Sequence, residues 1–423
     1  MKKAFIKNSY WKDIILQTSG NTIAQVVGLI GMPILTRLYV PETFATQAIF
    51  IQLVTFLTAI ISFRYEYFIQ LLEDINQSHT LILWIAKIGL VMTTILTGGL
   101  IILDKSNILS QFDLTFSKYY YFAPITAYLI SLSFAFKHEA ERQEAFKATS
   151  IAEIVSKSSY IGAGISLAKI LNGLGLILTT AFSAVGRLIY LREYISSFIS
   201  NIKNISSDKI LVKIFAKRSI GLVSSNTILS ISALLPLIII SKQYGANNLG
   251  QFSLVMSTIF LPSGLIGSAV GNVFYQRTAK LWNIKDFDGL KKIWKDTILK
   301  LLIFAIPTYA VIYLISPWVY PLVFGDQWKV SGEIAQLMTI AAFFSFLAGP
   351  IDRISLVLGI GFYLPAIHLL RLGVIAAVSF LTIFESLNYL TFIIILSIGL
   401  SSVYMIDVLL GRFYFLERYA KHE

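Results

Sequence analysis

Long apolar runs separated by short polar segments dominate the chain. Runs such as "LILWIAKIGLVMTTILTGGLIIL" (81–103) do not alternate apolar and polar residues, as the strands of a membrane barrel would. A helix needs about 20 apolar residues to cross the hydrocarbon core of a bilayer. Windows of that size predict twelve membrane-spanning helices: 14–36, 45–69, 80–103, 119–136, 151–168, 173–191, 220–240, 249–272, 298–316, 333–357, 362–384 and 387–411. The pattern therefore predicts an all-α integral membrane protein.

The composition strengthens this interpretation. Of the 423 residues 56% are hydrophobic and only 14% are charged, which is too apolar for a soluble multidomain protein. The chain has no cysteine, so disulfides and thiolate metal sites are excluded. We expect no cofactor, because the four histidines have no metal-ligand spacing and no phosphate-binding glycine-rich loop or Ser-His-Asp set is present.

The net charge of +12 has its explanation in topology rather than in nucleic-acid binding. With both termini in the cytoplasm, the predicted cytoplasmic segments carry 23 Lys and Arg residues and the external connections carry six. This asymmetry follows the positive-inside rule and predicts cytoplasmic termini. The cytoplasmic segment 286–296 is amphipathic, with three lysines off its apolar face, so we expect it to lie against anionic headgroups.

The chain contains a weak internal repeat. "SGNTI" (19–23) recurs as "SSNTI" (224–228), at corresponding places in two six-span halves. Six is an even number, so the halves enter the membrane in the same orientation and form a parallel repeat. We expect a first six-helix bundle over 1–196, a cytoplasmic linker over 197–219 and a second six-helix bundle over 220–423, arranged around a central cavity.

Seven of the ten prolines lie within predicted spans, Pro33 and Pro236 among them. Each removes a backbone hydrogen bond and favours a kink, which would let helices bend between two packings. The alternative is that proline is simply commoner in membrane helices than in soluble ones.

Ionisable side chains within spans are the candidate site. They cost several kcal/mol unless they line a cavity, find a partner or extend to the interface. The cations lie on six different spans, in the inner half or at the middle, and predict a positively charged vestibule for an anionic ligand: Arg64, Lys87, Lys157, Arg187, Arg353 and Arg371. Arg371 is about 13 Å inside its span, too deep for simple snorkelling, whereas snorkelling is the favoured account for Arg187 and Arg353.

Three further features complete the candidate site. Asn21 and Gln25 could hydrogen-bond hydroxyl-rich groups, although hydrogen bonds between helices are an alternative. Glu153 and Lys157 have the i, i+4 spacing of a structural ion pair. Arg64 and Glu66 point about 200° apart on a helix, so we expect separate partners: the vestibule for Arg64 and a cation on a neighbouring helix for Glu66.

Three stretches resemble the polysaccharide flippases of bacterial surface-glycan assembly. They are "GLIGMPILTRLYVPETFATQAIF" (28–50), "FRYEYFIQLLED" (63–74) and "FGDQWKVSGEIAQLM" (324–338). This family, which includes O-antigen and capsule flippases, belongs to the multidrug, oligosaccharidyl-lipid and polysaccharide exporter superfamily. The resemblance places Arg37 in the family's "TRLY" and Arg64 to Glu66 in its "RYE"; the second half has no clear counterpart of "RYE".

The resemblance implies a function. It implies that the chain is no enzyme and exports an undecaprenyl-pyrophosphate-linked oligosaccharide from the inner to the outer leaflet of the bacterial inner membrane, by alternating access. Membrane lipids and a polymerase and chain-length regulator of the same pathway are the expected partners. Two alternatives remain: a superfamily exporter of lipid II or small molecules, and a membrane glycan polymerase or glycosyltransferase.

Overall fold

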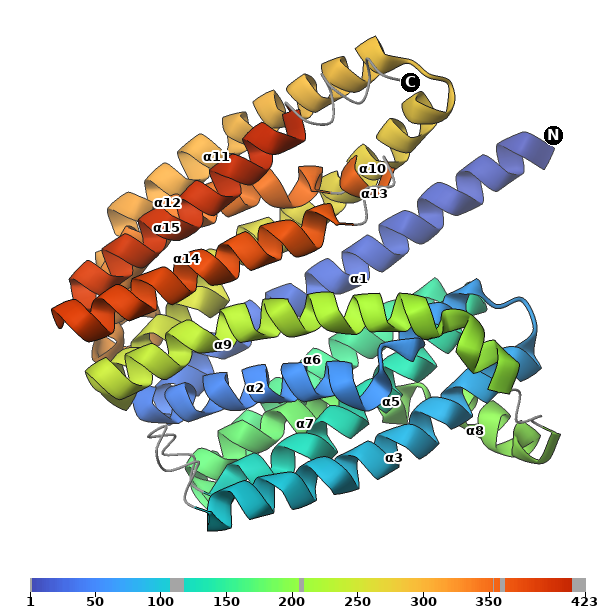
Figure 1. Ribbon diagram of the computed structural model, residues 1–423, viewed down its shortest axis with the longest axis horizontal. Coiled ribbons are helices and arrows are strands. Elements are labelled where there is room, and N and C mark those ends of the chain that lie inside the picture. The colour runs from blue at the N-terminus through green and yellow to red at the C-terminus, as the bar shows by residue number, and fades with distance from the viewer. Residues whose placement is uncertain (1, 107–117, 205–208, 353, 358–361, 413–423) are drawn as a thin grey trace. The chain divides into compact units, whose positions relative to one another are not determined.

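A computed structural model describes residues 2–106, 118–204, 209–352, 354–357 and 362–412. Every regular element in these ranges is helical, as the sequence predicts (Figure 1). The chain forms two compact units, Met1–Ser230 and Ile231–Glu423. Each is described separately below.

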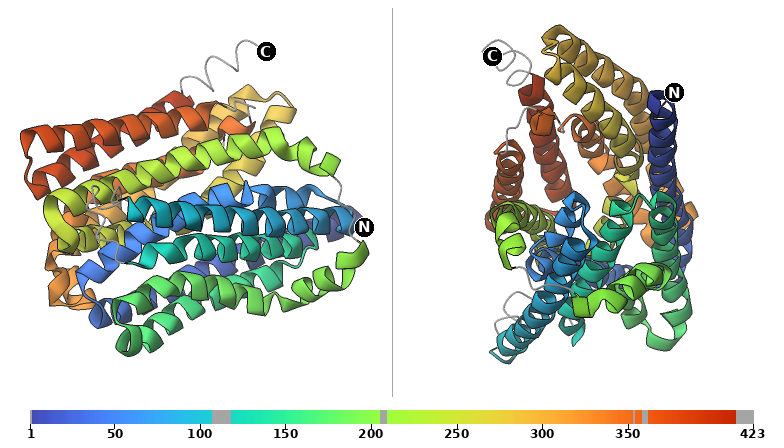
Figure 2. Two further views of the ribbon diagram at one scale, coloured as in Figure 1. Left: turned by 60° about the horizontal axis from the view of Figure 1, so that its bottom comes forward. Right: turned by 90° about the vertical axis from the view of Figure 1, so that its right-hand side faces the viewer.

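The first unit consists of the helices up to the early part of α9. Their bounds are α1 (Lys2–Leu38), α2 (Pro41–Ser62), η1 (Tyr65–Leu71), α3 (Ile75–Lys105), η2 (Lys118–Phe122), α5 (Ala123–Arg142), α6 (Phe146–Leu171), α7 (Gly173–Tyr190), α8 (Arg192–Asn201), η3 (Ile202–Asn204) and α9 (Lys209–Ile259). Figure 2 shows the blue-to-green helices of this unit running alongside one another.

The second unit begins within α9. It continues with the π-helical turn η4 (Ser263–Gly267), α10 (Ser268–Asn283), α11 (Phe287–Phe324), η5 (Asp326–Trp328), α12 (Lys329–Ile351), α13 (Ile354–Val357), α14 (Tyr363–Glu385) and α15 (Tyr389–Leu410). A buried cluster around Phe274, Leu290 and Tyr363 joins α10, α11, α14 and α15.

The predicted spans coincide with helices, but some boundaries differ. Nine helices of the described residues are long and apolar enough to cross a membrane. One of these stretches, 210–283, contains two predicted spans, and Gly245 divides it with φ +85°, a conformation that glycine adopts readily. The fourth predicted span, 119–136, falls on η2 and α5, and the fifth, 151–168, lies within α6. The second predicted span, 45–69, extends beyond α2, which ends at Ser62.

Local sequence signals explain several helix ends. Pro41 occupies the first turn of α2, where its missing N–H costs nothing. Asp74, Asp286 and Asn388 cap α3, α11 and α15 by accepting backbone N–H groups at 3.1, 2.8 and 2.9 Å. Such caps satisfy amide groups that the first turn of a helix leaves unpaired.

The segment between the two predicted bundles packs on the first unit. Phe198 of α8 and Leu211 and Phe215 of α9 belong to a buried cluster with residues of η1, α3 and α5. The Tyr65 hydroxyl also donates to the Val212 carbonyl at 3.0 Å. Within this unit, the described residues 197–204 and 209–219 are therefore helical and pack on it.

Candidate functional site

A backbone turn positions Arg64. Phe63 and Arg64 both adopt left-handed conformations, with φ of +48° and +56°, which is uncommon for residues other than glycine. The Ser219 hydroxyl donates to the Phe63 carbonyl at 2.6 Å, and the Arg64 amide donates to the Ser62 hydroxyl at 3.1 Å. These bonds stabilise the turn, after which the chain continues as η1.

The turn brings Arg64 and Glu66 together. Arg64 Nη1 lies 3.4 Å from Glu66 Oε1, and Nη2 donates to Asn226 Oδ1 at 3.1 Å. The prediction that these two residues take separate partners was therefore wrong, because the i, i+2 separation of an α-helix does not apply after α2 has ended. Arg64 is 8% exposed and Glu66 is 1% exposed. The group is a buried ion pair with no net charge.

A second buried charge cluster connects three helices. Glu153 of α6 accepts from Arg187 of α7 at 2.9 Å and from Lys137 of α5 at 2.6 Å. Arg187 also donates to the Ser133 hydroxyl at 2.8 Å and lies 4.6 Å from the centre of the Phe134 ring. Glu153 thus bridges cations from two neighbouring helices, and Lys137 also lies 3.9 Å from Glu141. The predicted Glu153–Lys157 pair is wrong, because among the described residues these two partners occupy the carboxylate.

Lys157 lies one helical turn further into the predicted span. It is half-buried, and its Nζ is 5.1 Å from the centre of the Tyr160 ring. Its side chain packs on α1 at Gly28, where a Cβ atom would come within 2.4 Å of the lysine Cε. Within the described ranges no carboxylate lies within ion-pair distance of this ammonium. Lys157 is therefore a partly buried cation outside the direct ion pairs of Glu153.

Polar groups that the sequence analysis did not select lie beside Lys157. Gln47 of α2 is buried and donates to the Tyr160 hydroxyl at 2.7 Å and to the Leu176 carbonyl at 2.9 Å. It also lies 3.2 Å from the Thr179 hydroxyl. An amide in a mostly apolar part of a span, which also contains Gln52, was the signal that could have identified it.

A further network of hydrogen bonds and ion pairs lies at the C-terminal end of α5, beyond the predicted span. Glu139 is buried and accepts from Arg142 at 2.7 Å and from Gln143 at 2.7 Å, and it bonds the Ser78 hydroxyl. Burial raises the pKa of the Glu139 carboxyl, but these hydrogen bonds outweigh burial and hold that pKa below its ordinary value. His138, Glu141 and Gln70 form a neighbouring set. The charge pattern "KHEAER" (137–142) was the available signal.

Arg371 is the corresponding cation of the second unit. It is half-buried in α14, and its guanidinium carbon lies 5.9 Å from the centre of the Tyr404 ring of α15. Its Nε is enclosed and has no hydrogen-bond partner among the described residues. Nearby on the same two helices, the buried Asp407 accepts from the Tyr363 hydroxyl. Arg371 thus retains donors for a ligand.

The remaining predicted site residues are placed as follows. Lys87 is exposed on the face of α3 that also carries the exposed Leu90 and Val91. On α1, Asn21 and Arg37 are exposed, and Gln25 and Pro33 are half-buried. Pro236 lies inside α9. Arg353 lies outside the described residues.

The two units therefore contain paired and unpaired cations. Arg64 and Arg187 have acidic partners, whereas Lys157 and Arg371 have none within the described part of the chain. No group of three His, Cys, Asp or Glu side chains in that part could hold a metal ion. Because Arg64 and Arg187 are paired with carboxylates, fewer of the six predicted cations lack an acidic partner than the sequence indicates.

Comparisons with known proteins agree with this architecture. A family described as polysaccharide biosynthesis protein matches residues 34–333. No curated protein matches the chain.

Solved transporter structures share the fold. A multidrug resistance MATE family transporter of the MOP superfamily in an inward-facing conformation has a TM-score of 0.72 at 13% identity, covering 97% of this chain and 96% of that chain. A MOP superfamily transporter from Pyrococcus furiosus has a TM-score of 0.66 at 13% identity, covering 97% of each chain. The outward-facing conformation of a MATE family transporter has a TM-score of 0.63 at 14% identity, covering 96% of each. The chain is thus a multi-pass membrane protein that belongs to the polysaccharide biosynthesis family and has the fold of the MOP superfamily transporters.

Proposed function

We propose that this protein is a flippase for lipid-linked oligosaccharides. It moves an undecaprenyl-pyrophosphate-linked repeat unit from the inner to the outer leaflet of the bacterial cytoplasmic membrane, by alternating access, for the synthesis of a surface polysaccharide. Family membership supports the pathway, and the transporter fold supports movement of a cargo rather than catalysis. The cargo itself rests on the chemistry of the candidate site.

The observation that carries this proposal is the unpaired ammonium of Lys157. It lies about 10 Å from the inner end of its predicted span, where an unneutralised cation is costly unless a ligand or water compensates for it. The stem of the side chain packs on Gly28, and the ring of Tyr160 lies beside the charged end. Because these contacts restrict its movement, Lys157 can present its charge to a ligand at low entropic cost.

Pyrophosphate fits such a group. Hydrogen bonds between an ammonium or guanidinium and a phosphate oxygen are shorter and about twice as strong as those between neutral groups. Asn21 and Gln25 lie on the same helix as Gly28 and could donate to or accept from sugar hydroxyls. Arg371 offers a second cation in the other unit. Each of these cations would repel a cationic cargo.

The paired arginines have a different role in this proposal. Arg64 is held by Glu66 and Asn226, and Arg187 by Glu153 and Ser133. An ion pair of this kind fixes the positions of the elements that carry it and leaves little charge for a ligand. We therefore assign Arg64 and Arg187 to the scaffold of the site, and Lys157 to substrate binding.

The test compares three variants in cells whose chromosomal copy is deleted. We expect Lys157→Gln to lose surface polysaccharide and to accumulate the lipid-linked intermediate in the inner leaflet, while Lys157→Arg retains most of the activity. Lys169→Gln removes an exposed cation near the other end of the same helix and should behave like the wild type. Protein amounts in the membrane are measured in parallel.

Three results would contradict the proposal. Normal polysaccharide and no accumulated intermediate in Lys157→Gln would show that this cation does not bind the cargo. Accumulation of lipid II or of a small molecule in the deletion strain would identify the protein as another exporter of the superfamily. Sugar transfer by the purified protein in detergent would indicate an enzyme instead.

A further inference from the structure

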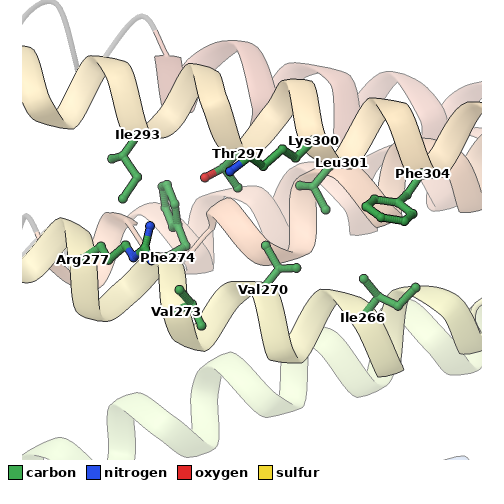
Figure 3. A pocket seen from close by; sticks show the side chains of 10 residues that line it. All are labelled: Ile266, Val270, Val273, Phe274, Arg277, Ile293, Thr297, Lys300, Leu301 and Phe304. Carbon is green, nitrogen blue, oxygen red and sulfur yellow. The ribbon is translucent and has the colours of Figure 1, made fainter.

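A pocket in the second unit is separate from the candidate site. It has a volume of about 440 Å³, within the range of pockets that hold small ligands. It lies between α10 with the preceding turn η4 and the first half of α11 (Figure 3). Eight of its ten lining residues are uncharged and mostly apolar: Ile266, Val270, Val273, Phe274, Ile293, Thr297, Leu301 and Phe304.

The two charged lining residues are both basic. Arg277 projects from α10 and Lys300 from α11 into the space between the helices, and the Lys300 side chain runs back toward Thr297 (Figure 3). Among the described residues, neither side chain has a carboxylate within ion-pair distance, and no acidic residue lines the pocket. An occupant must therefore be compatible with two uncompensated positive charges.

The charges and the apolar walls lie at different depths. Arg277 follows the inner end of the predicted span 249–272 by five residues, and Ile266 lies six residues inside it. The two residues are thus roughly 16 Å apart along the helix axis. On α11, Phe304 lies four residues further into the predicted span 298–316 than Lys300. Both charges lie toward the predicted cytoplasmic end of the pocket, together with Phe274 and Ile293, and the lining on the other side is apolar (Figure 3).

The surrounding surface favours negative charge. Between Arg277 and Lys300 the chain has five further basic and three acidic residues. At the start of α11, Leu290 and Trp294 are buried, whereas Lys291, Lys292 and Lys295 are exposed. Basic residues next to the inner leaflet attract anionic lipids, with about 1 kcal/mol contributed by each one near the surface.

We infer that this pocket binds an acidic phospholipid of the inner leaflet. The phosphate lies between Arg277 and Lys300, and the first part of an acyl chain lies against Ile266, Val270 and Phe304. This site goes beyond the proposed flippase activity, because its occupant is a resident lipid rather than the cargo. Binding would tie the cytoplasmic ends of α10 and α11 together and stabilise the second unit.

Other occupants fit the observations less well. A soluble anion such as inorganic phosphate would use the two cations but would leave the apolar walls exposed. Arg277 and Lys300 are exposed, so a neutral sugar would gain nothing from their charges, and an organic cation would be repelled by them. A polyprenyl phosphate carries the same phosphate head group, but its chain is long. The first part of a phospholipid acyl chain is enough to fill the pocket.

The test measures lipid binding by the purified full-length protein in detergent, by native mass spectrometry. Phosphatidylglycerol and phosphatidylcholine with identical acyl chains are compared. We expect the wild type to bind phosphatidylglycerol about 30-fold more tightly, as two cations at about 1 kcal/mol each would give. The double variant Arg277→Gln/Lys300→Gln should lose this preference, and Val270→Phe, which fills the apolar wall, should weaken the binding of both lipids.

A matched control removes the same number of charges from the same helices. Lys280 and Lys292 are exposed and do not line the pocket, so Lys280→Gln/Lys292→Gln should retain the preference. Thermal unfolding of each variant without lipid verifies that it is folded.

Several outcomes would overturn the inference. Equal affinity of the wild type for the two lipids would do so, as would an unchanged preference in the Arg277→Gln/Lys300→Gln variant. Displacement of phosphatidylglycerol by millimolar inorganic phosphate would indicate a simple anion site. Stronger competition by undecaprenyl phosphate would assign the pocket to the cargo. None of these results depends on transport activity, so the flippase proposal is tested separately.

Discussion

The charge cluster on α5, α6 and α7 yields the sharpest prediction about stability. In Glu153→Gln, the carboxylate that accepts from Lys137 at 2.6 Å and from Arg187 at 2.9 Å becomes a neutral amide. Two cations about 6 Å apart at an effective dielectric constant near 20 repel each other by about 3 kcal/mol. Removing one partner of a buried pair costs a similar amount, because the other charge is left uncompensated.

A second substitution should recover part of the loss. Arg187→Gln in the same chain removes the uncompensated cation, and Lys137 retains Glu141 at 3.9 Å. We therefore expect the double variant Glu153→Gln/Arg187→Gln to be more stable than Glu153→Gln alone. The recovery is incomplete, because the contact of Arg187 with the Phe134 ring and its hydrogen bond to Ser133 are also lost.

The assay is thermal unfolding of the purified protein in detergent. For a bundle of this size, about 3 kcal/mol corresponds to a fall in Tm of roughly 6–10 °C. Glu193→Gln removes an exposed carboxylate from α8 and should leave the Tm unchanged. The reasoning is refuted if Glu153→Gln behaves like this control, or if the double variant is no more stable than Glu153→Gln.

Two further predictions concern the backbone and pH. Gly245→Ala should lower the free energy of unfolding by about 1–3 kcal/mol, because its φ of +85° strains any residue with a Cβ atom even though the surrounding space is open. Gly221→Ala lies in a helical and equally open part of α9. It should leave the free energy of unfolding unchanged or raise it by up to about 1 kcal/mol. Equal effects of the two substitutions on the Tm would contradict this. The Glu139 carboxyl, whose pKa is lowered in the folded state, stabilises the protein above its unfolded pKa of about 4.3, and this contribution is lost as the pH falls through the folded pKa. Glu139→Gln should therefore flatten the acid side of a Tm-versus-pH profile, and an unchanged slope would exclude this role.

The sequence predicted the fold class because hydrophobic runs of spanning length leave few alternatives in a bilayer. It placed the end of the second span incorrectly for a physical reason. The residues after Ser62 are still apolar and largely buried, so hydropathy continues although the α-helix has ended. Hydropathy reports the environment of a residue, whereas a turn through two left-handed residues depends on partners such as Ser219, which is distant in the sequence.

The candidate site was predicted less completely, because ion-pair partners come from other helices. The spacing of Glu153 and Lys157 indicated a pair, but Lys137 and Arg187 approach the carboxylate from α5 and α7. Single-helix spacing cannot reveal such competition. The same limit applies to Gln47, whose partners lie on α6 and α7.

Translocation of the cargo by the purified protein tests the central proposal most directly. The protein is reconstituted into liposomes with an undecaprenyl-pyrophosphate-linked oligosaccharide, and the fraction of sugar accessible to an external glycan-oxidising or glycan-cleaving reagent is followed with time. We predict that the wild type makes the inner-leaflet fraction accessible and that Lys157→Gln, at equal protein content, does so much more slowly. Accessibility no faster than in protein-free liposomes would contradict the account.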